Sequence, residues 1–392
     1  MTTMFTVKGN EYFMDSHTEV FNDEFAEVRF NEFLSEMEEK TIWKEVPMDT
    51  FHFSAVDSPL QMSGGATDSE KNTVMYGTKM FAYANDLPYV GIRDCAMPSI
   101  TERFGVGCRL YDDSDEKQKA AILNMSAAQN AKRKALVSVV DGKINAVLSA
   151  NDDKNSYQIF SPVDIFELTK ETLEDLEDDT APTKFEGSWS YDSIFAKWHM
   201  PKVQKVGDKE YKTLISLYTS NVGEGSVTYG GDLVRGSTVI PFMTPVRIAH
   251  RKRNTGFDLM EADDMLRSAI EDAVKSIPEK MTQSIEKLEE LNDTEIMNPV
   301  NCMRLISEAV SLPKRITKGI IEEYEATRGN TPATAFVLYE TLAQVIDRLP
   351  TNDPKRQKQV RGDVMKLLGA HWKKYDVPAE EKATQIGLDF AD

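Results

Sequence analysis

The chain contains few of the residues that mark disulfide scaffolds, metal centres and membrane spans. Its 392 residues include three cysteines, Cys95, Cys108 and Cys302, too few and too widely spaced for a disulfide framework or a Cys-x-x-Cys metal motif. No apolar run approaches the roughly 20 residues that a membrane-spanning helix needs. We therefore expect a protein without structural zinc, without a membrane span and without a metal or cofactor of its own.

Signatures of the common catalytic sites are also missing. The five histidines show no His-Glu-x-x-His spacing, and no Gly-x-Ser-x-Gly nucleophile elbow accompanies them. Gly223-x-Gly225 lacks the third glycine of a dinucleotide-binding loop, so we interpret it as a turn between strands. The acidic run Glu167–Asp179 could bind a divalent cation, but without calcium-loop spacing it is more typical of a solvated helix end and linker. We expect a protein that is not an enzyme.

Negative charge dominates what is present. Aspartate and glutamate number 64 against 46 lysines and arginines, which gives a net charge of −18. This balance excludes a generally basic surface for coating nucleic acid, although a local basic patch on an acidic body remains compatible with it. The first residues, Met1–Phe5, lack the basic and apolar regions of a secretory signal. Together with the low cysteine count, this predicts a cytoplasmic location.

The clearest local prediction is a β-hairpin at Ala135–Ala150. Two runs of apolar and β-branched residues flank Asp141-Gly142, a dipeptide suited to the positive φ angles of a tight turn. Upstream, apolar spacing predicts a helix that Gly105 ends. We also predict an amphipathic helix within Phe13–Lys40 and a strand at Ile42–Met48.

From Asp258 onward, apolar residues recur every three or four positions, which is typical of long amphipathic helices, with Pro278 either kinking the first helix or opening a second. The sequence therefore predicts an α+β protein. An antiparallel β-hairpin-rich sheet region with helices on one face would be followed by an α-helical C-terminal region. The predicted parts are an N-terminal helix and strand region (1–91), an α+β core (92–257) and the helical C-terminal region (258–392).

Basic residues gather in two short stretches, Lys132–Lys134 and Arg247–Arg253, with the single residue Arg235 as a third contributor. Arg247–Arg253, Arg-Ile-Ala-His-Arg-Lys-Arg, holds five basic or titratable residues among seven. Such density raises like-charge repulsion unless a polyanion, or the protein's own acids, neutralises it. If the two stretches and Arg235 lie together, they would form a groove that follows a phosphate backbone. The candidate nucleic-acid-binding residues are Lys132, Arg133, Lys134, Arg235, Arg247, His250, Arg251, Lys252 and Arg253.

Aromatic residues are dense between the acidic run and the basic stretch Arg247–Arg253. Trp189, Tyr191, Phe195 and Trp198 occur at mixed spacing ahead of a strand-like segment. Tryptophan and tyrosine in strands usually pack within a core or on a sheet face. The alternative interpretation is a platform on which nucleobases stack.

Several short motifs occur in an order that resembles a known family. A helix of the type Ala-x-x-x-Ile-x-x-Arg-Phe-Gly, a helix ending in Leu-Asn, an Asp-Gly turn and the strand Ala-Val-Leu-Ser follow one another. This order resembles phage/plasmid-like proteins of the family called domain of unknown function 932, over most of Ile92–Asp347. The matching residues and stretches are Ala96, Ile100, Arg103, Phe104, Gly105, Leu123, Asn124, Lys134, Asp141, Gly142, Ala146, Val147, Leu148, Ser149, Tyr218–Ser226, Ile240–Arg247, His250–Gly256 and Gly329–Thr331.

The resemblance implies a phage or mobile-element origin, hence the host cytoplasm, and assigns no activity. Together with the basic stretches and aromatics, it leads us to expect a nucleic-acid-binding protein with single-stranded DNA as its favoured partner. An oligomeric single-strand-binding or annealing protein is the specific form of this expectation. Three alternatives stay open. They are a host-interaction or anti-defence protein with an acidic binding surface, a self-assembling virion structural protein, and a metal-dependent nuclease with its carboxylates in a cleft.

Overall fold

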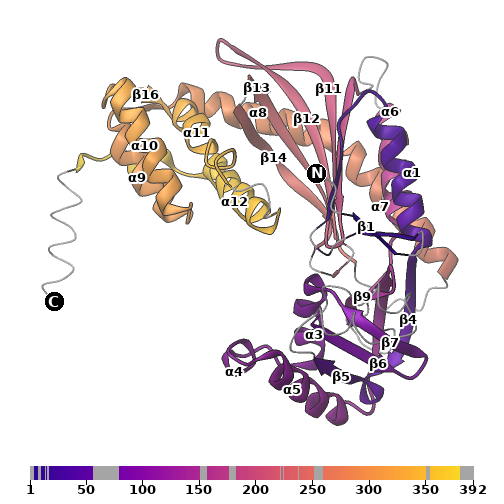
Figure 1. Ribbon diagram of the computed structural model, residues 1–392. Coiled ribbons are helices and arrows are strands. Elements are labelled where there is room, and N and C mark those ends of the chain that lie inside the picture. Colours follow the sequence, from indigo (N-terminus) through magenta and orange to yellow (C-terminus); the bar gives the residue numbers. More distant parts are fainter. Residues whose placement is uncertain are drawn as a thin grey trace, which may run out of the picture.

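Two six-stranded β-sheets and a set of mainly C-terminal helices make up the protein in a computed structural model (Figure 1). This confirms the predicted α+β class. No helix in the described part of the chain is long and apolar enough to cross a lipid bilayer. The structure describes residues 4–7, 10–13, 15, 17–55, 79–150, 157–175, 182–220, 222–223, 225–236, 238–250, 259–349 and 354–379.

The larger sheet is antiparallel throughout and has the strand order β14-β13-β12-β11-β10-β3. Consecutive strands from β10 to β14 are neighbours, so this part is a meander, and the N-terminal strand β3 joins it at the edge. The strands are β3 (Thr18–Phe21), β10 (Lys184–Ser190), β11 (Ile194–Val206), β12 (Lys209–Thr219), β13 (Val227–Arg235) and β14 (Thr238–Ile248).

The smaller sheet has the order β4-β8-β9-β7-β6-β5, with one parallel pair, β7 and β9. Its centre is the predicted hairpin, which is confirmed, with Asp141 and Gly142 both at positive φ in the turn. The strands are β4 (Thr41–Pro47), β5 (His52–Ala55), β6 (Met80–Ala84), β7 (Leu87–Ile92), β8 (Lys134–Val140) and β9 (Lys143–Ser149). A separate hairpin, β1 (Met4–Val7) and β2 (Asn10–Phe13), precedes both sheets.

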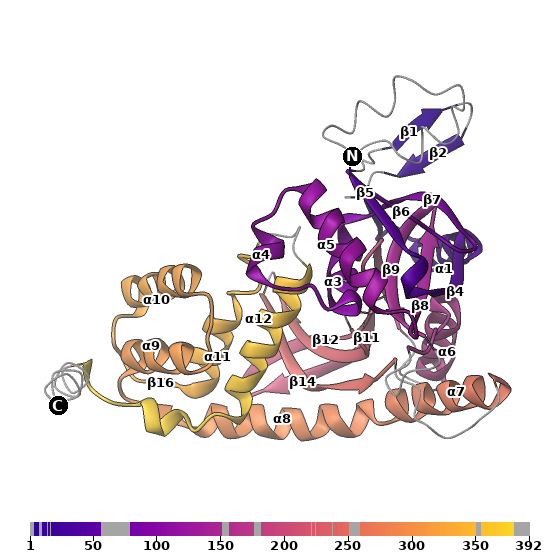
Figure 2. The same cartoon turned by 90° about the horizontal axis from the view of Figure 1, so that it is seen from below.

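Strand β11 shows how the larger sheet divides into two faces. From Ile194 to Met200 its residues alternate between buried and half-buried, because successive side chains of a strand point to opposite sides. Ala196 and Trp198 are buried on what we call the covered face, while Phe195, Lys197 and His199 are half-buried on the open face. On the covered face, the Trp198 ring stacks at 5.8 Å on Phe166 of α6 (Pro162–Glu174). Helices α1 (Ala26–Glu39), α6, α7 (Leu259–Lys275) and α8 (Ile277–Asp293) line this side (Figure 2).

The remaining helices form two groups. One covers the smaller sheet: α3 (Met97–Phe104), α4 (Arg109–Asp112) and α5 (Glu116–Gln129). Gly105 ends α3 in the left-handed conformation, as predicted. The other group lies beyond β14 and carries the small sheet of β15 (Glu295–Ile296) and β16 (Ala333–Thr334). It comprises α9 (Pro299–Ala309), α10 (Lys314–Arg328), α11 (Ala335–Ala343) and α12 (Pro354–Lys366).

Two predictions differ from the structure in detail. The N-terminal segment is not one long helix, because Thr18–Phe21 pairs with β10 before α1 begins at Ala26. The spacing of apolar residues that predicted a helix is also compatible with the short edge strand Thr18–Phe21, so the sequence pattern did not separate the two. The predicted boundary between 91 and 92 falls inside β7, and the boundary between 257 and 258 lies outside the described residues.

Candidate functional site

A cavity of about 730 Å³ lies on the open face of the larger sheet, and we call it the sheet-face groove. Its floor is formed by residues of β10 to β14, among them Phe195, Lys197 and Tyr218. Helix α12 forms one wall, and the other wall includes Asp15, His17 and residues of the smaller sheet's part of the chain. Small side chains and glycines on β12 and β13 keep the floor low, so the groove follows from the strand sequence.

Cationic side chains gather at the α12 side of the groove. Arg247 of β14 and Lys358 of α12 both line it, and the Lys358 ammonium lies 3.9 Å from the centroid of the Tyr218 ring. Burial, reinforced by the nearby positive charge of Arg247, lowers the pKa of Lys358 to about 8. Within the described residues neither Lys358 nor Arg247 forms an ion pair. The fold thus holds two like charges near each other without an acid of their own.

A third cation in the same wall is neutralised internally. The Arg361 guanidinium donates a hydrogen bond to Oδ1 of Asp232, whose side chain is 0% exposed. Burial also lowers the pKa of Lys197, an effect that the Asp232 carboxylate partly offsets. Asp347 belongs to the same neighbourhood, and burial raises its pKa. The Arg361–Asp232 pair holds α12 on the open face, whereas Lys358 and Arg247 line the groove without an acid paired to them among the described residues.

The opposite wall carries acids that the protein itself uses. The Asp15 carboxylate accepts from the Arg93 guanidinium at 2.6 Å and from the Lys143 ammonium at 3.0 Å. Burial lowers the pKa of Lys143, with Asp15 opposing the change. Asp192 accepts from the Ser190 hydroxyl at 2.6 Å. These acids therefore fix the junction of the two sheets and leave the groove charged differently at its two sides.

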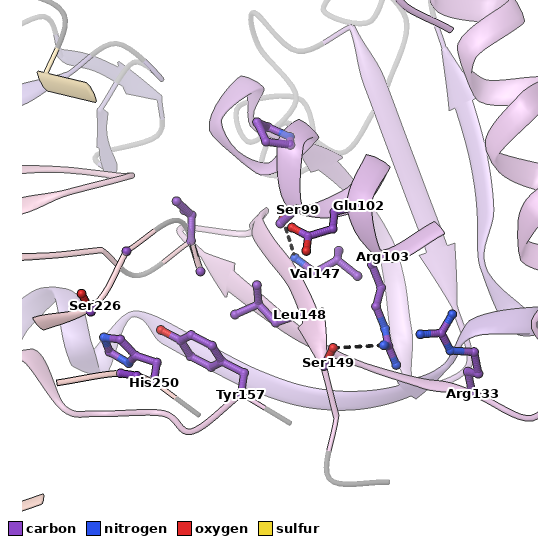
Figure 3. Close-up of a pocket in the computed structure, with 15 residues that line it drawn as sticks. Ser99, Glu102, Arg103, Arg133, Val147, Leu148, Ser149, Tyr157, Ser226 and His250 are labelled. Atoms are coloured by element: carbon purple, nitrogen blue, oxygen red, sulfur yellow. Dashed lines mark hydrogen bonds between the residues drawn. The ribbon is translucent and has the colours of Figure 1, made fainter. Parts of the chain in front are cut away.

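A second cavity, of about 670 Å³, lies where the two sheets meet, and we call it the inter-sheet pocket (Figure 3). Residues of α3 and β9 line it from the smaller sheet, and Val222, Gly223, Gly225, Ser226 and His250 line it from the larger one. Arg103 is buried there, with its guanidinium donating to the Ser149 hydroxyl at 3.0 Å and to the carbonyl of Lys134. Arg133 lines the same pocket from an exposed position.

His250 is a packing residue of this pocket and carries no positive charge near neutral pH. Its ring stacks on Tyr157 with 5.0 Å between centroids and 3° between planes. Burial lowers its pKa to about 4, although a hydrogen bond with the Gln158 carbonyl at 3.3 Å favours the charged form. The basic character that the sequence suggested for His250 is therefore absent from the fold.

The structure brings together only part of the predicted basic set. Lys132 and Arg133 are exposed just before β8, and Lys134 is exposed as its first residue, with its ammonium 3.9 Å from Glu45. Arg235 pairs with Thr238, whereas Arg247 pairs with Thr228, seven residues from Arg235 along β13, which separates the two arginines by roughly 23 Å at about 3.3 Å per residue. The predicted residues Arg251, Lys252 and Arg253 lie outside the described residues.

The sequence interpretation missed the cations of α12. Its sequence, Pro-Lys-Arg-Gln-Lys-Gln-Val-Arg-Gly-Asp-Val-Met-Lys, contains five basic residues and one acid in a chain with a net charge of −18. That local reversal of charge was the available signal. Lys197 could not have been found in the same way, because it is a single lysine in an alternating strand.

The aromatic residues follow the packing interpretation. Trp189, Tyr191 and Trp198 are buried, which confirms their predicted role in the core. Phe195 and Tyr218 are half-buried on the open face and line the sheet-face groove. Among the aromatic residues that line this groove, Phe195 and Tyr218 are the two whose rings are not fully buried, and they are the candidates for base stacking there.

Two further observations concern possible metal ligands and similarity to known proteins. No group of three or more histidine, cysteine or acidic side chains in the described ranges could hold a metal ion. The stretches on which the family resemblance depends, including Arg103, Ser149 and Gly225, meet in the inter-sheet pocket. Comparisons with models of protein families, with curated proteins and with solved structures gave no match, so the resemblance stays a prediction.

Proposed function

We propose that the protein binds single-stranded nucleic acid in the sheet-face groove, with phosphates held by Arg247 and Lys358. One observation carries the proposal. Two neighbouring cations without an ion-pair partner among the described residues face a cavity in a protein of strongly negative net charge. Like charges held together and partly desolvated raise the free energy of the folded state, and a bound polyanion removes that penalty.

Single strands fit the groove better than duplexes. Its volume of about 730 Å³ is in the range of pockets that enclose small ligands, whereas a duplex is rigid and too wide to enter such a cavity. Phe195 and Tyr218 offer ring surface close to the cations, and stacking on aromatic rings tolerates every base. The arrangement supports binding of backbone and bases together, with little dependence on sequence.

The motif order described above is the argument for a phage or mobile-element setting in the host cytoplasm. There, a single-strand-binding protein would serve annealing or recombination. Nothing in the groove requires a chemical step, and we propose binding without catalysis.

The test is a salt-titrated binding assay with single-stranded DNA, duplex DNA and RNA. The double variant Arg247→Ala, Lys358→Ala is compared with the wild type. Because each phosphate contact to a single strand contributes about 0.7 to the salt slope, we expect the slope to become shallower by about 1.4. Arg235→Ala is the matched control, since it removes an exposed arginine from the far end of the same sheet. Equal affinity and slope in the double variant would refute this function.

A second candidate is binding of a protein partner or of a second copy of the chain. It is supported by large apolar side chains exposed on β3 and at the start of α1, where Phe25 is 63% exposed and Val20 and Val28 are similar. Nucleic-acid affinity that ignores the double variant, together with a mass in solution above that of one chain, would favour this candidate.

A further inference from the structure

The Lys358 amine has a defined place in the sheet-face groove. Its nitrogen lies 3.9 Å from the centroid of the Tyr218 ring, and a Cβ atom added to Gly225 would lie 3.2 Å from it. Gly362 comes four residues later on α12, hence on the same helix face, and also lines the groove. A Cβ atom added there would meet no atom within 4 Å. The amine is therefore packed against a ring and backbone, while the helix face that carries it leaves room for a ligand.

The charges around this amine do not include a paired acid. Asp232 is paired with Arg361, and Asp15 accepts hydrogen bonds from two other cations. In the part of the chain that the structure describes, no carboxylate forms an ion pair with Lys358. The charge that acts on it is that of Arg247, which together with burial lowers its pKa to about 8. These surroundings favour the neutral amine over the ammonium.

A neutral amine is a nucleophile, whereas an ammonium is not. With a pKa of about 8, about a tenth of Lys358 is neutral at pH 7, against about one part in 2,500 for a lysine with a pKa near 10.4. Burial beside a second cation is an arrangement by which proteins activate lysine for imine formation with carbonyl compounds. Because Arg247 stays positively charged, the groove can bind phosphate while the amine reacts.

We propose that Lys358 captures single strands that have lost a base, by forming an imine with the aldehyde of the ring-opened sugar. The inference rests on the proposed function and names the class of strand that the groove holds most firmly. An intact strand has no aldehyde, whereas a sugar without its base opens to an aldehyde at C1′, close to the phosphates on either side.

The capture step balances without an oxidant or a cofactor. The Lys358 nitrogen forms a bond to C1′, and the bond between C1′ and the aldehyde oxygen breaks. Both hydrogens of the neutral amine leave with that oxygen as water. Hydrolysis of the imine reverses the step, so the protein holds the strand covalently without turnover.

Sodium cyanoborohydride tests this step, because it delivers hydride to an imine and leaves a stable secondary amine. Fluorescein-labelled oligothymidylates of about 16 nucleotides, with and without one abasic position, are incubated with the protein and this reductant at pH 7. A denaturing gel measures the covalent adduct, and peptide mass mapping locates it. We expect an adduct with the abasic strand alone, attached to Lys358.

Two variants on α12 make the test specific. Lys358→Arg keeps a positive charge but has no nucleophilic amine, so it should lower the adduct yield at least about tenfold. Lys366→Arg is the matched control, because Lys366 is exposed on the same helix, pairs with Asp363 at 2.6 Å and does not line the groove. It should give as much adduct as the wild type.

The outcomes separate this inference from the proposed function. If the intact strand binds but the abasic strand gives no adduct, or Lys358→Arg gives as much adduct as the wild type, the groove binds strands and the capture is wrong. If glycolaldehyde phosphate labels Lys358 and the abasic strand does not, the groove captures a small aldehyde, which also overturns the inference. If neither strand binds, the proposed function itself fails.

Discussion

The two faces of the larger sheet use the same strands for different purposes. On β11, Ala196 and Trp198 point to the covered face and pack beneath α1 and α6, while Phe195 and Lys197 point to the open face and line the groove. The covered face has aromatic rings in contact, such as Trp198 with Phe166. The open face has charge, small residues and empty volume. Stability and binding are therefore separable along a single strand, residue by residue.

The difference between the faces shows which residues of a strand determine stability and which determine binding. Burial of apolar area stabilises the fold and tolerates few changes of volume. Substitutions in a groove floor change the free energy of unfolding little, but the charges there determine which ligand binds. Variants on alternate residues should therefore fall into two classes, and the contrast between the faces can be tested directly.

The largest effect is expected on the covered face, from Trp198→Ala. This change removes a fully buried indole that packs on Phe166 and Phe185, and its Nε1 donates to Glu27 at 3.1 Å. Large-to-small core changes of this kind lower the free energy of unfolding by about 3–5 kcal/mol. Chemical denaturation measures this loss of unfolding free energy. Lys212→Ala, an exposed position on β12, is the control and should stay within about 0.5 kcal/mol of wild type. Equal losses in both variants would contradict the division between faces.

A smaller loss is expected where α12 is fixed to the open face, from Arg361→Ala. The Asp232 carboxylate would remain buried without its cation, and its Oδ2 already lacks a hydrogen-bond partner among the described residues. Breaking a buried pair destabilises by about 3–5 kcal/mol, and we expect about 2–3 kcal/mol because the Arg361 side chain is 24% exposed.

The reason for that loss can be checked with a second substitution. Asp232→Asn in the Arg361→Ala background removes the unpaired charge and should restore part of the unfolding free energy. No recovery in the double variant would mean that packing of α12, rather than the buried carboxylate, controls stability here.

Local chemistry explains what could be predicted from the sequence. The hairpin was predictable because a tight turn requires positive φ, which Asp141-Gly142 tolerates, and because the flanking residues are apolar on both sides. The end of α3 was predictable from Gly105. In both places the deciding interactions join residues that are close in the chain.

The candidate site was less predictable, because it depends on pairing between distant segments. Arg247 and Arg235 are only twelve residues apart in sequence, yet the β13–β14 register puts them at opposite ends of the sheet. Conversely, Lys358 meets Arg247 only because α12 packs back on the open face. Charge counting along the chain identified Arg247 but had no means of identifying its partner.

The smallest effect concerns the protonation of Lys358, whose pKa of about 8 lies below the ordinary value near 10.4. Between these values the unfolded chain binds more protons than the folded one, so this group makes folding more favourable as pH rises from about 8 to about 10. Its effect on binding has the opposite sign, because a neutral amine no longer attracts phosphate. Single-strand affinity should therefore fall as pH rises through about 8.

Lys358→Arg tests this assignment, because the guanidinium stays charged across the whole range. The variant should bind single strands with a flatter pH profile than wild type, and it should lose the rise in stability that Lys358 contributes between about pH 8 and about pH 10. Both profiles are measured at fixed ionic strength, so that screening does not imitate titration. A variant whose affinity falls with pH as steeply as that of wild type would show that another group controls binding, and the open face would then lose Lys358 as its phosphate contact.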